Sequence, residues 1–283
     1  MTVTDEQRAR FDEHGYLVFD PGFPEDLLES AVAELDRLWD RSASKPDDPF
    51  APRIRHAWRQ SPAMRELTTW PAIDALLCGL FGRQPVAFQT LSFYVGTEQH
   101  LHSDAIHFNS FPTGLMCGVW IALEDMDEDN GALLYAPGSH RWPEYRMEDV
   151  GVPSVRIYYH EYEKFIVAKL DETGLATESA CIGKGQALVW HGNLLHGGGP
   201  RRDRRRTRLS HVVHYTFDGC GMWAPIRSRG RRRFVRNPRP IRAAETAADR
   251  LRWLRGFVRP WCLWHALTHN VPHLAKTILL RQN

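Results

Sequence analysis

The residues His102 and Asp104 have the types and the spacing of a metal site. One residue separates them, and on an extended strand positions i and i+2 point to the same face. Two histidines and one carboxylate that hold one face of iron(II), with the opposite positions open, are typical of non-haem oxygenases. The second histidine must come from elsewhere in the chain. The natural candidate is His196, in the segment Leu195-His196-Gly197-Gly198.

An H-x-D pair alone is weak evidence, because a chain with 14 histidines can contain one by chance. A structural or surface pair is the usual meaning of such a pattern. His191 is a rival for the third ligand, although it lies out of phase with His196 on a strand. His211 and His214 should point to opposite faces, so we do not expect them to bind a second metal together. For His140, in Gly138-Ser139-His140, we expect a turn with a packed or hydrogen-bonded imidazole.

Arg208 and Ser210 strengthen the hypothesis of a metal site. They begin an apolar segment that follows His196, and an arginine and a serine two residues apart on one strand can together bind a carboxylate. A dicarboxylate co-substrate would present that group while its other end binds the metal. Arg206 has the same strand parity and remains a rival. Position in the chain favours Arg208 over Arg206, because Arg208 adjoins the apolar strand and shares a face with Ser210.

The elements that must position these residues begin with helices. Thr4-Asp5-Glu6-Gln7 predicts a capped helix start, and Glu13-His14-Gly15 predicts its end. A short strand, a helix that opens at Pro24 and a helical segment over 61–80 should follow. After these come short runs rich in β-branched and aromatic residues, at 86–95, 115–123, 133–136, 186–190 and 209–217. This order predicts an α+β protein with a barrel or double-sheet core.

The C-terminal part, about 241–283, has helical character again. Its aromatic and leucine positions recur at helical spacing, and Pro260 predicts two helices rather than one. These positions are Trp253, Leu254, Phe257, Trp261, Trp264 and Leu267. We expect this extension to pack on a core of about 11–220, with a few residues reaching the substrate pocket, so that 1–283 forms a single domain. A lid over the site and an amphipathic membrane contact are the alternatives.

Composition limits the class of protein. The 283 residues are 43% hydrophobic and 25% charged, with a net charge of +2, which is ordinary for a globular enzyme. The chain has no apolar run of membrane-spanning length and no signal-peptide pattern at its start, so a cytoplasmic protein without a membrane span is expected. Five scattered cysteines without a C-x-x-C indicate buried free thiols. The arginine-rich run 201–206 lacks interleaved aromatics, which argues against a nucleic-acid partner.

Several sequence blocks carry a resemblance to a known family. They are QHLHSD at 99–104, VWIALED at 119–125, NGAL at 130–133, APGSH at 136–140, GQALVWH at 185–191 and HG at 196–197. In this order and spacing, the chain resembles the phytanoyl-CoA dioxygenase family of iron(II)- and 2-oxoglutarate-dependent oxygenases, from about residue 11 to 215. The resemblance implies a double-stranded β-helix, a jelly-roll or cupin-like barrel, with supporting N- and C-terminal helices.

The resemblance also implies roles for individual residues. The iron(II) ligands would be His102, Asp104 and His196. Arg208 would bind the distal carboxylate of 2-oxoglutarate with Ser210 as a helper, and Gln89 and Trp120 would line the co-substrate pocket. The gap from His196 to the arginine is one residue longer than in the family pattern, and the loop 201–206 is expected to absorb it.

The implied activity consumes 2-oxoglutarate and O2 and oxidises a C–H bond of a small organic metabolite, most simply by hydroxylation, with natural-product tailoring as the favoured setting. Asp104 argues against halogenation, because halogenating relatives replace this carboxylate with Ala or Gly. An epimerase, desaturase or ring-forming oxidase on the same scaffold is an alternative, and so is a catalytically silent protein that binds metal or 2-oxoglutarate. The loop 107–109 is a candidate for substrate contacts. The sequence does not indicate the substrate or the oligomeric state.

Overall fold

The N-terminal elements follow from local capping. The structure, a computed structural model, describes residues 3–42 and 53–243. Helix α1 (Asp5–His14) begins with a capping box between Thr4 and Gln7 and ends at Gly15 in the left-handed conformation, as predicted. Strand β1 (Tyr16–Phe19) and helix α2 (Glu25–Ser42) follow. The predicted apolar stripe of α2 faces the core through Leu28, Leu35 and their neighbours.

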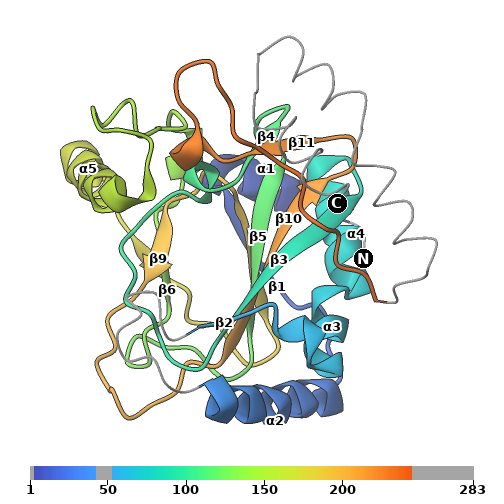
Figure 1. Cartoon of the computed structure of the whole chain (residues 1–283). Helices are drawn as coiled ribbons and strands as arrows, with labels where there is room; N and C mark the ends of the chain where they lie inside the picture. The colour runs from blue at the N-terminus through green and yellow to red at the C-terminus, as the bar shows by residue number, and fades with distance from the viewer. Residues whose placement is uncertain (1–2, 43–52, 244–283) are drawn as a thin grey trace.

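The segment 61–80 forms two helices, where the sequence suggested one helical stretch. Helix α3 (Pro62–Thr68) ends before Trp70, whose backbone is extended, and helix α4 (Pro71–Phe81) begins at Pro71. The break has a physical cause, because Pro71 has no amide proton and disfavours helical backbone in the residue before it. Helices α2, α3 and α4 lie beside the largest sheet (Figure 1), and their apolar faces contribute to the largest core cluster.

The largest sheet is antiparallel and has the order β1-β8-β5-β10-β3-β2. Four of its strands were predicted with small errors at their ends. The strands that join β1 are β2 (Arg53–Arg55), β3 (Pro85–Phe93), β5 (Met116–Ala122), β8 (Ala187–His191) and β10 (Ser210–Phe217). Strand β10 lies between β3 and β5, with Val212 opposite Leu91 and Trp120. Val212 packs in one core cluster and the next residue, Val213, in another, so the two faces of β10 serve different layers of the protein.

Two three-stranded sheets complete the strands that the structure describes, in the orders β7-β6-β9 and β12-β11-β4. Their bounds are β4 (Asn109–Phe111), β6 (Leu133–Tyr135), β7 (Glu178–Ser179), β9 (His196–Gly198), β11 (Gly221–Trp223) and β12 (Val235–Arg236). Strands β6 and β9 lie across from the large sheet, on the side away from α2–α4 (Figure 1). A second core cluster joins Trp120, Leu188 and Val212 of the large sheet to Leu133 of β6. The fold is thus a set of facing antiparallel sheets with supporting helices.

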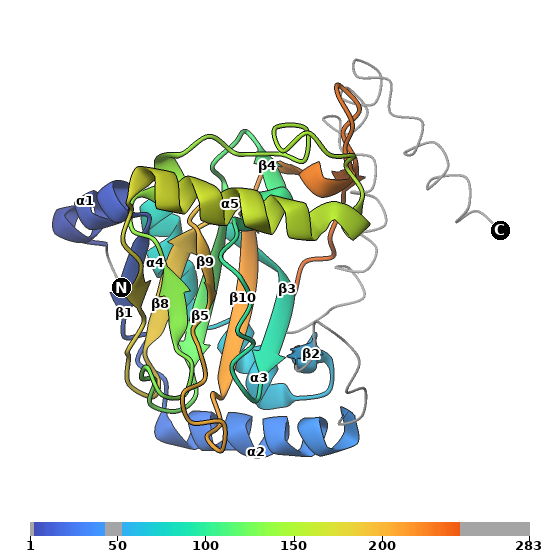
Figure 2. The same ribbon diagram turned by 90° about the vertical axis from the view of Figure 1, so that its left-hand side faces the viewer.

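Helix α5 (Tyr159–Thr173) crosses the end of the molecule where β4 and β11 lie (Figure 2). The sequence reading did not identify it. Short 3-10 turns connect the other elements: η1 (Ala57–Arg59), η2 (Asp104–Ile106), η3 (Ser139–Arg141), η4 (Arg156–Tyr158) and η5 (Pro225–Arg227). Helix α5 buries Tyr159, Tyr162 and Ile166 in a small third cluster.

Three sequence predictions concern regions away from the site. The two helices expected around Pro260 lie outside the described residues, and so does Cys262. The prediction of buried thiols is correct for Cys117 and Cys220 but wrong for Cys181, which is exposed in the loop after β7. Within residues 3–42 and 53–243, no helix is both long and apolar enough to cross a membrane.

Candidate active site

His102, Asp104 and His196 come together in the interior of the molecule. His102 forms an isolated antiparallel bridge with His196, which begins β9. The expectation that His102 and Asp104 share a strand was wrong, because Asp104 starts the turn η2. Ser103 is extended, and its hydroxyl accepts a hydrogen bond from the amide of Ala105, so the chain turns into η2 after the histidine. Because Ser103 is extended, the side chains of His102 and Asp104 still lie on the same side of the backbone.

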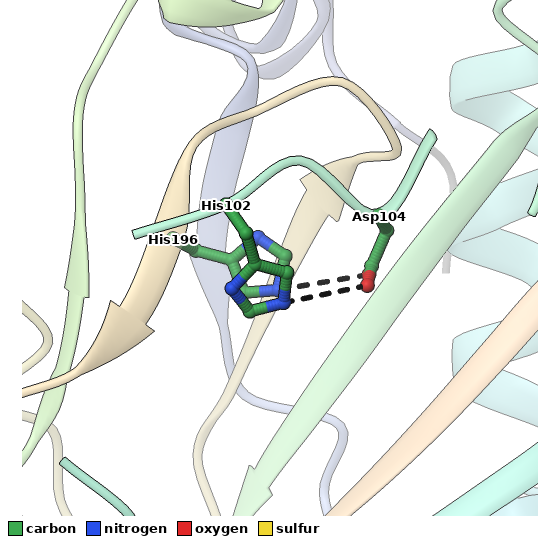
Figure 3. A group of neighbouring side chains, drawn as sticks. All are labelled: His102, Asp104 and His196. Carbon is green, nitrogen blue, oxygen red and sulfur yellow. Dashed lines mark ion pairs between the residues drawn. The ribbon is translucent and has the colours of Figure 1, made fainter. Parts of the chain in front are cut away.

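The three side chains are oriented toward one point. Nε2 of His102 lies 3.9 Å from Oδ1 of Asp104, and Nε2 of His196 lies 3.6 Å from Oδ2. Both imidazoles point toward the carboxylate (Figure 3), and all three residues can offer ligand atoms within 4.8 Å of one another. All three are buried. This is the arrangement of two imidazoles and one carboxylate that suits iron(II).

Hydrogen bonds set the tautomer of both histidines. Nδ1 of His102 lies 2.9 Å from the carbonyl oxygen of His100, and Nδ1 of His196 lies 3.0 Å from that of Leu194. A carbonyl oxygen can only accept, so each Nδ1 carries the proton and each Nε2 keeps its lone pair. The lone pairs therefore face Asp104, as metal ligands must. Buried carbonyl partners of this kind are what hold metal-binding histidines in orientation.

Two further side chains, which the sequence reading missed, fix Asp104. Nε1 of Trp190 donates to Oδ2 of Asp104 at 3.0 Å, and Nε2 of His214 lies 3.3 Å from the same oxygen. A carboxylate accepts, so this His214 nitrogen carries a proton. Because both donors converge on Oδ2, Oδ1 is the oxygen left to ligate a metal. The one feature of the sequence that could have indicated His214 is that it shares strand parity with Arg208 and Ser210.

The electrostatics of the triad favour the protonation states that bind a metal. Burial, with a contribution from nearby His196, lowers the pKa of His102 to about 4. Burial also lowers the pKa of His196. For Asp104, burial alone would raise the pKa, but the neighbouring imidazoles of His196, His214 and His102 lower it overall. Neutral imidazoles beside an ionised carboxylate are the forms in which these groups bind a cation.

The position of His196 depends on close backbone contacts. The Ser139 hydroxyl donates to the carbonyl of Ala136 and accepts from the amide of Leu195, which fixes the residue before His196. A Cβ at Gly197 would lie 2.5 Å from the carbonyl oxygen of Gln99, so only glycine fits after the histidine. The expected turn at 138–140 is present, and Nε2 of His140 lies 3.2 Å from the carbonyl oxygen of Asp12.

A cavity of about 780 Å³ opens beside the triad. Arg208 lines it and is buried, with its guanidinium over the rings of Phe93 and Trp120 at 5.2 and 5.6 Å. Its Nη1 donates to the hydroxyl of Ser210 at 3.1 Å, while Nε has no hydrogen-bond partner in the part of the chain that the structure describes. Burial lowers the pKa of Arg208 to about 10, so the guanidinium stays charged at neutral pH. Among residues 3–42 and 53–243, this buried cation forms no ion pair, although the charge of Glu124 acts on it.

The other predicted site residues fall around this cavity in different ways. Gln89 and Trp120 line it, whereas Ser210 lies behind Arg208 and contacts its guanidinium. Arg206, the rival of Arg208, lies at the surface and forms an ion pair with Asp127, its Nη2 2.8 Å from Oδ2. His191 does not join the triad, because its Nδ1 accepts the amide of Asn193.

In the loop after the metal motif, His107 and Phe108 line the cavity, as the sequence suggested. Asn109 does not, because its side chain donates to Glu144.

The family model described as Phytanoyl-CoA dioxygenase (PhyH) matches residues 11–208. The chain belongs to this family. The resemblance seen in the sequence is thereby confirmed.

Curated relatives of the PhyH family match parts of the chain. Phytanoyl-CoA dioxygenase domain-containing protein 1 from Mus musculus is 36% identical over 93 residues, which cover 31% of this chain and 32% of that protein. The Danio rerio protein of the same name is 28% identical, with 61% and 60% covered. The peroxisomal phytanoyl-CoA dioxygenase from Rattus norvegicus is 24% identical, with 76% and 69% covered. The match thus spans about a third of the first of these relatives and 60% and 69% of the other two.

Solved structures with the same fold are iron and 2-oxoglutarate enzymes. The carbocyclase SnoK from nogalamycin biosynthesis aligns with a TM-score of 0.63 and 18% identity, covering 77% of this chain and 86% of SnoK. The epimerase SnoN, in complex with Fe3+, alpha ketoglutarate and nogalamycin RO, gives 0.59 and 22%, with 77% and 84% covered. EctD from S. alaskensis with bound Fe gives 0.58 and 22%, with 76% and 77% covered. At these identities the likeness concerns the fold.

Proposed function

We propose that this PhyH-family protein is an iron(II)- and 2-oxoglutarate-dependent dioxygenase that oxidises a C–H bond of a small organic metabolite, most simply by hydroxylation. The observation that carries the proposal is the buried triad His102, Asp104 and His196, whose Nε2 lone pairs face one carboxylate. Iron(II) bound there would couple the oxidative decarboxylation of 2-oxoglutarate to succinate, with O2 as oxidant, to oxidation of the substrate.

The donor set fits the metal. Two neutral nitrogens and one carboxylate oxygen leave open positions for a co-substrate and oxygen, as in the facial triads of such enzymes. In this chain, Trp190 and His214 hold Asp104 in place through Oδ2. The carbonyls of His100 and Leu194 hold the two imidazoles. These residues orient the ligands before a metal binds, which reduces the cost of assembling the site.

Arg208 would bind the distal carboxylate of 2-oxoglutarate. A buried guanidinium without an anionic partner has lost its hydration and regains electrostatic stabilisation when a carboxylate arrives. The rings of Phe93 and Trp120 hold the guanidinium between them, and Ser210 takes one of its donors. Gln89 and the Nε1 of Trp120, which has no hydrogen-bond partner, are polar groups available to the same ligand.

We also infer that the facing antiparallel sheets form a double-stranded β-helix, and that 1–283 is one oxygenase domain. The sheet containing β5, β8 and β10 would be one half of the barrel, and β6 with β9 would belong to the other. His102, which bridges to His196, and Asp104 would then lie in the barrel mouth between the two halves. This inference is supported by the fold shared with SnoK and EctD.

A second candidate reaction uses the same ligands. SnoK is a carbocyclase and SnoN an epimerase, so the same fold supports ring formation and stereochemical inversion. These reactions differ in what replaces the abstracted hydrogen, which depends on the position of the substrate rather than on the metal ligands. Substrate oxidation with oxygen insertion remains the proposal, and the product mass distinguishes the three.

The experiment is a mass-spectrometric screen of metabolite extracts incubated with the iron-loaded enzyme, with and without 2-oxoglutarate. Hydroxylation adds one oxygen to a metabolite, ring formation removes two hydrogens, and epimerisation leaves the mass unchanged but shifts the retention time. Asp104→Ala is the matched control. A product that forms equally with Asp104→Ala, or without 2-oxoglutarate, would contradict the proposal.

A further inference from the structure

The walls of the cavity carry an excess of positive charge. Besides Arg208, its lining includes Arg53, Arg55, Arg156, Arg227 and Arg236. Among the described residues that line it, Asp104 is the sole carboxylate. That carboxylate already accepts from Trp190 and His214. The 2-oxoglutarate carboxylate proposed for Arg208 would neutralise that arginine.

Two of these arginines are held at the end of the cavity formed by η5 and β12. Arg227 lies with its guanidinium carbon 3.8 Å from the ring centroid of Phe234, and Arg236 lies 4.7 Å from that of Phe108. The structure gives neither guanidinium a carboxylate partner among residues 3–42 and 53–243. Burial, and then the nearby charge of Arg227, lower the pKa of Arg236. Arg227 is exposed and Arg236 is half-buried, so two like charges lie near each other at the edge of the cavity.

This end of the cavity adjoins the metal site. The ring centroid of Phe108 is 5.4 Å from that of His214, and His214 contacts Asp104. One aromatic ring therefore separates the guanidinium of Arg236 from the residue that holds a metal ligand. The segment that carries η5 and β12 lies at the same end of the molecule as α5 and β4, opposite α2 (Figures 1 and 2).

The arginine pair is separate from the place proposed for the co-substrate. Arg208 precedes β10 and packs on Phe93 and Trp120, which pair with Ser210 and Val212 of β10, respectively. Arg236 instead packs on Phe108, whose ring lies against His214, six residues after Arg208 in the chain. A five-carbon dicarboxylate that joins the metal to Arg208 uses both of its carboxylates. It leaves none for Arg227 and Arg236.

We propose that the substrate carries an oxyanion, a carboxylate or a phosphate, that Arg227 and Arg236 bind, and an apolar body that packs on Phe108. This deepens and rests on the proposed function. Guanidinium groups bind both kinds of oxyanion through paired donors, so the shared chemistry is a planar cation facing two oxygens. The apolar side of the pocket is supplied by Phe108, Ile226 and Phe234, all of which line the cavity. The head group would set the distance between the anion and the oxidised carbon.

The test measures binding of three probes with one apolar body: 4-phenylbutyrate, phenethyl phosphate and the neutral 4-phenylbutyramide. Calorimetric titrations use the full chain loaded with iron(II) and saturated with 2-oxoglutarate without oxygen, so that Arg208 is occupied. The variants are Arg227→Gln, Arg236→Gln and Arg236→Lys. Arg231→Gln is the matched control, because Arg231 is exposed on the same segment and does not line the cavity.

At least one anionic probe should bind the wild type and the Arg231→Gln control at least tenfold more tightly than the amide. Arg227→Gln and Arg236→Gln should each weaken that anion roughly tenfold or more, with less loss in Arg236→Lys. The preferred anion identifies the head group. Equal binding of anions and amide, binding of neither anion, or unchanged affinity in both glutamine variants would overturn the inference.

Failure of the proposed function gives a different pattern. Conversion of 2-oxoglutarate to succinate by the same preparations is measured in parallel without a probe. Absence of that conversion, with anion binding still dependent on Arg236, contradicts the oxygenase and leaves the anion site. Normal conversion with probe affinity that depends on Arg208 rather than on Arg236 contradicts the anion site and leaves the oxygenase.

Discussion

Nε2 of His214 lies 3.3 Å from Oδ2 of Asp104, although the two residues are far apart in the chain. The sheet order β8-β5-β10 explains this proximity. Gly118 on β5 pairs with Trp190 on β8 and with His214 on β10. Because Gly118 has no side chain, the indole of Trp190 lies over this position and reaches the carboxylate. Three neighbouring strands thus hold the carboxylate of Asp104 in place.

Replacing His214 with phenylalanine should weaken metal binding about 10-fold to 100-fold, the usual effect of losing a hydrogen bond to a metal ligand. Phenylalanine keeps the ring that packs on Phe108 but cannot donate to Asp104. The measurement is anaerobic equilibrium binding of iron(II). His191→Asn is the control, because its Oδ1 can still accept the Asn193 amide. Unchanged iron(II) affinity in His214→Phe would contradict a positioning role for His214, and loss of binding in His191→Asn would make His191 a ligand.

Gly118→Ala should disturb Asp104 from a distance. A Cβ at residue 118 would lie 2.1 Å from the Trp190 ring, so the indole must move away from Oδ2. Overpacking of this kind costs about 1–3 kcal/mol of folding free energy. We expect a lower melting temperature and weaker iron(II) binding. Gly151→Ala is a comparison in which the added methyl meets no atom within 4 Å, although the left-handed backbone there carries its own strain. Unchanged metal affinity in Gly118→Ala would show that Trp190 does not position the carboxylate.

Arg208→Ala should raise the apparent Michaelis constant for 2-oxoglutarate by an amount corresponding to about 2–5 kcal/mol, because it removes a buried charge-assisted partner. Arg206→Ala is the matched control. Its guanidinium is paired with Asp127 at the surface, so the constant should stay near the wild-type value. The opposite result would mean that the binding arginine has been assigned in the wrong register.

His211 should make folding stability depend on pH. It is buried between the hydroxyls of Thr68 and Ser92, and burial lowers its pKa to about 3. The unfolded imidazole has a pKa near 6.5, so between about pH 6.5 and 3 only the unfolded state gains a proton. Stability therefore falls as the pH falls, by about 1.4 kcal/mol per pH unit for this one group.

Urea unfolding of the wild type and of His211→Asn between pH 7 and 4.5 tests this linkage. Other buried imidazoles, including His107 and His191, contribute to the wild-type slope, so the informative quantity is the difference between the two proteins. The slope of unfolding free energy against pH should be smaller in the variant by about 1.4 kcal/mol per pH unit. Equal slopes would mean that His211 is protonated in the folded protein.

Local patterns predicted half of the described strands and the three residues of the triad. The capping box at Thr4 and the alternating runs of β3, β5 and β10 depend on neighbours in sequence, so they could be read directly. The contact between Asp104 and His214 could not, because it depends on which strands lie side by side. Helix α5 was missed, although Gly174 ends it in the left-handed conformation.

The metal dependence of 2-oxoglutarate turnover tests the proposed oxygenase activity most directly. Succinate formation from 2-oxoglutarate should be measured in air for the wild type and for His102→Ala, Asp104→Ala and His196→Ala, with circular dichroism to confirm folding. We predict slow, iron(II)-dependent succinate formation by the wild type and none above background by the three folded variants. Wild-type rates in any of these variants, or no succinate from iron-loaded wild type, would contradict the account.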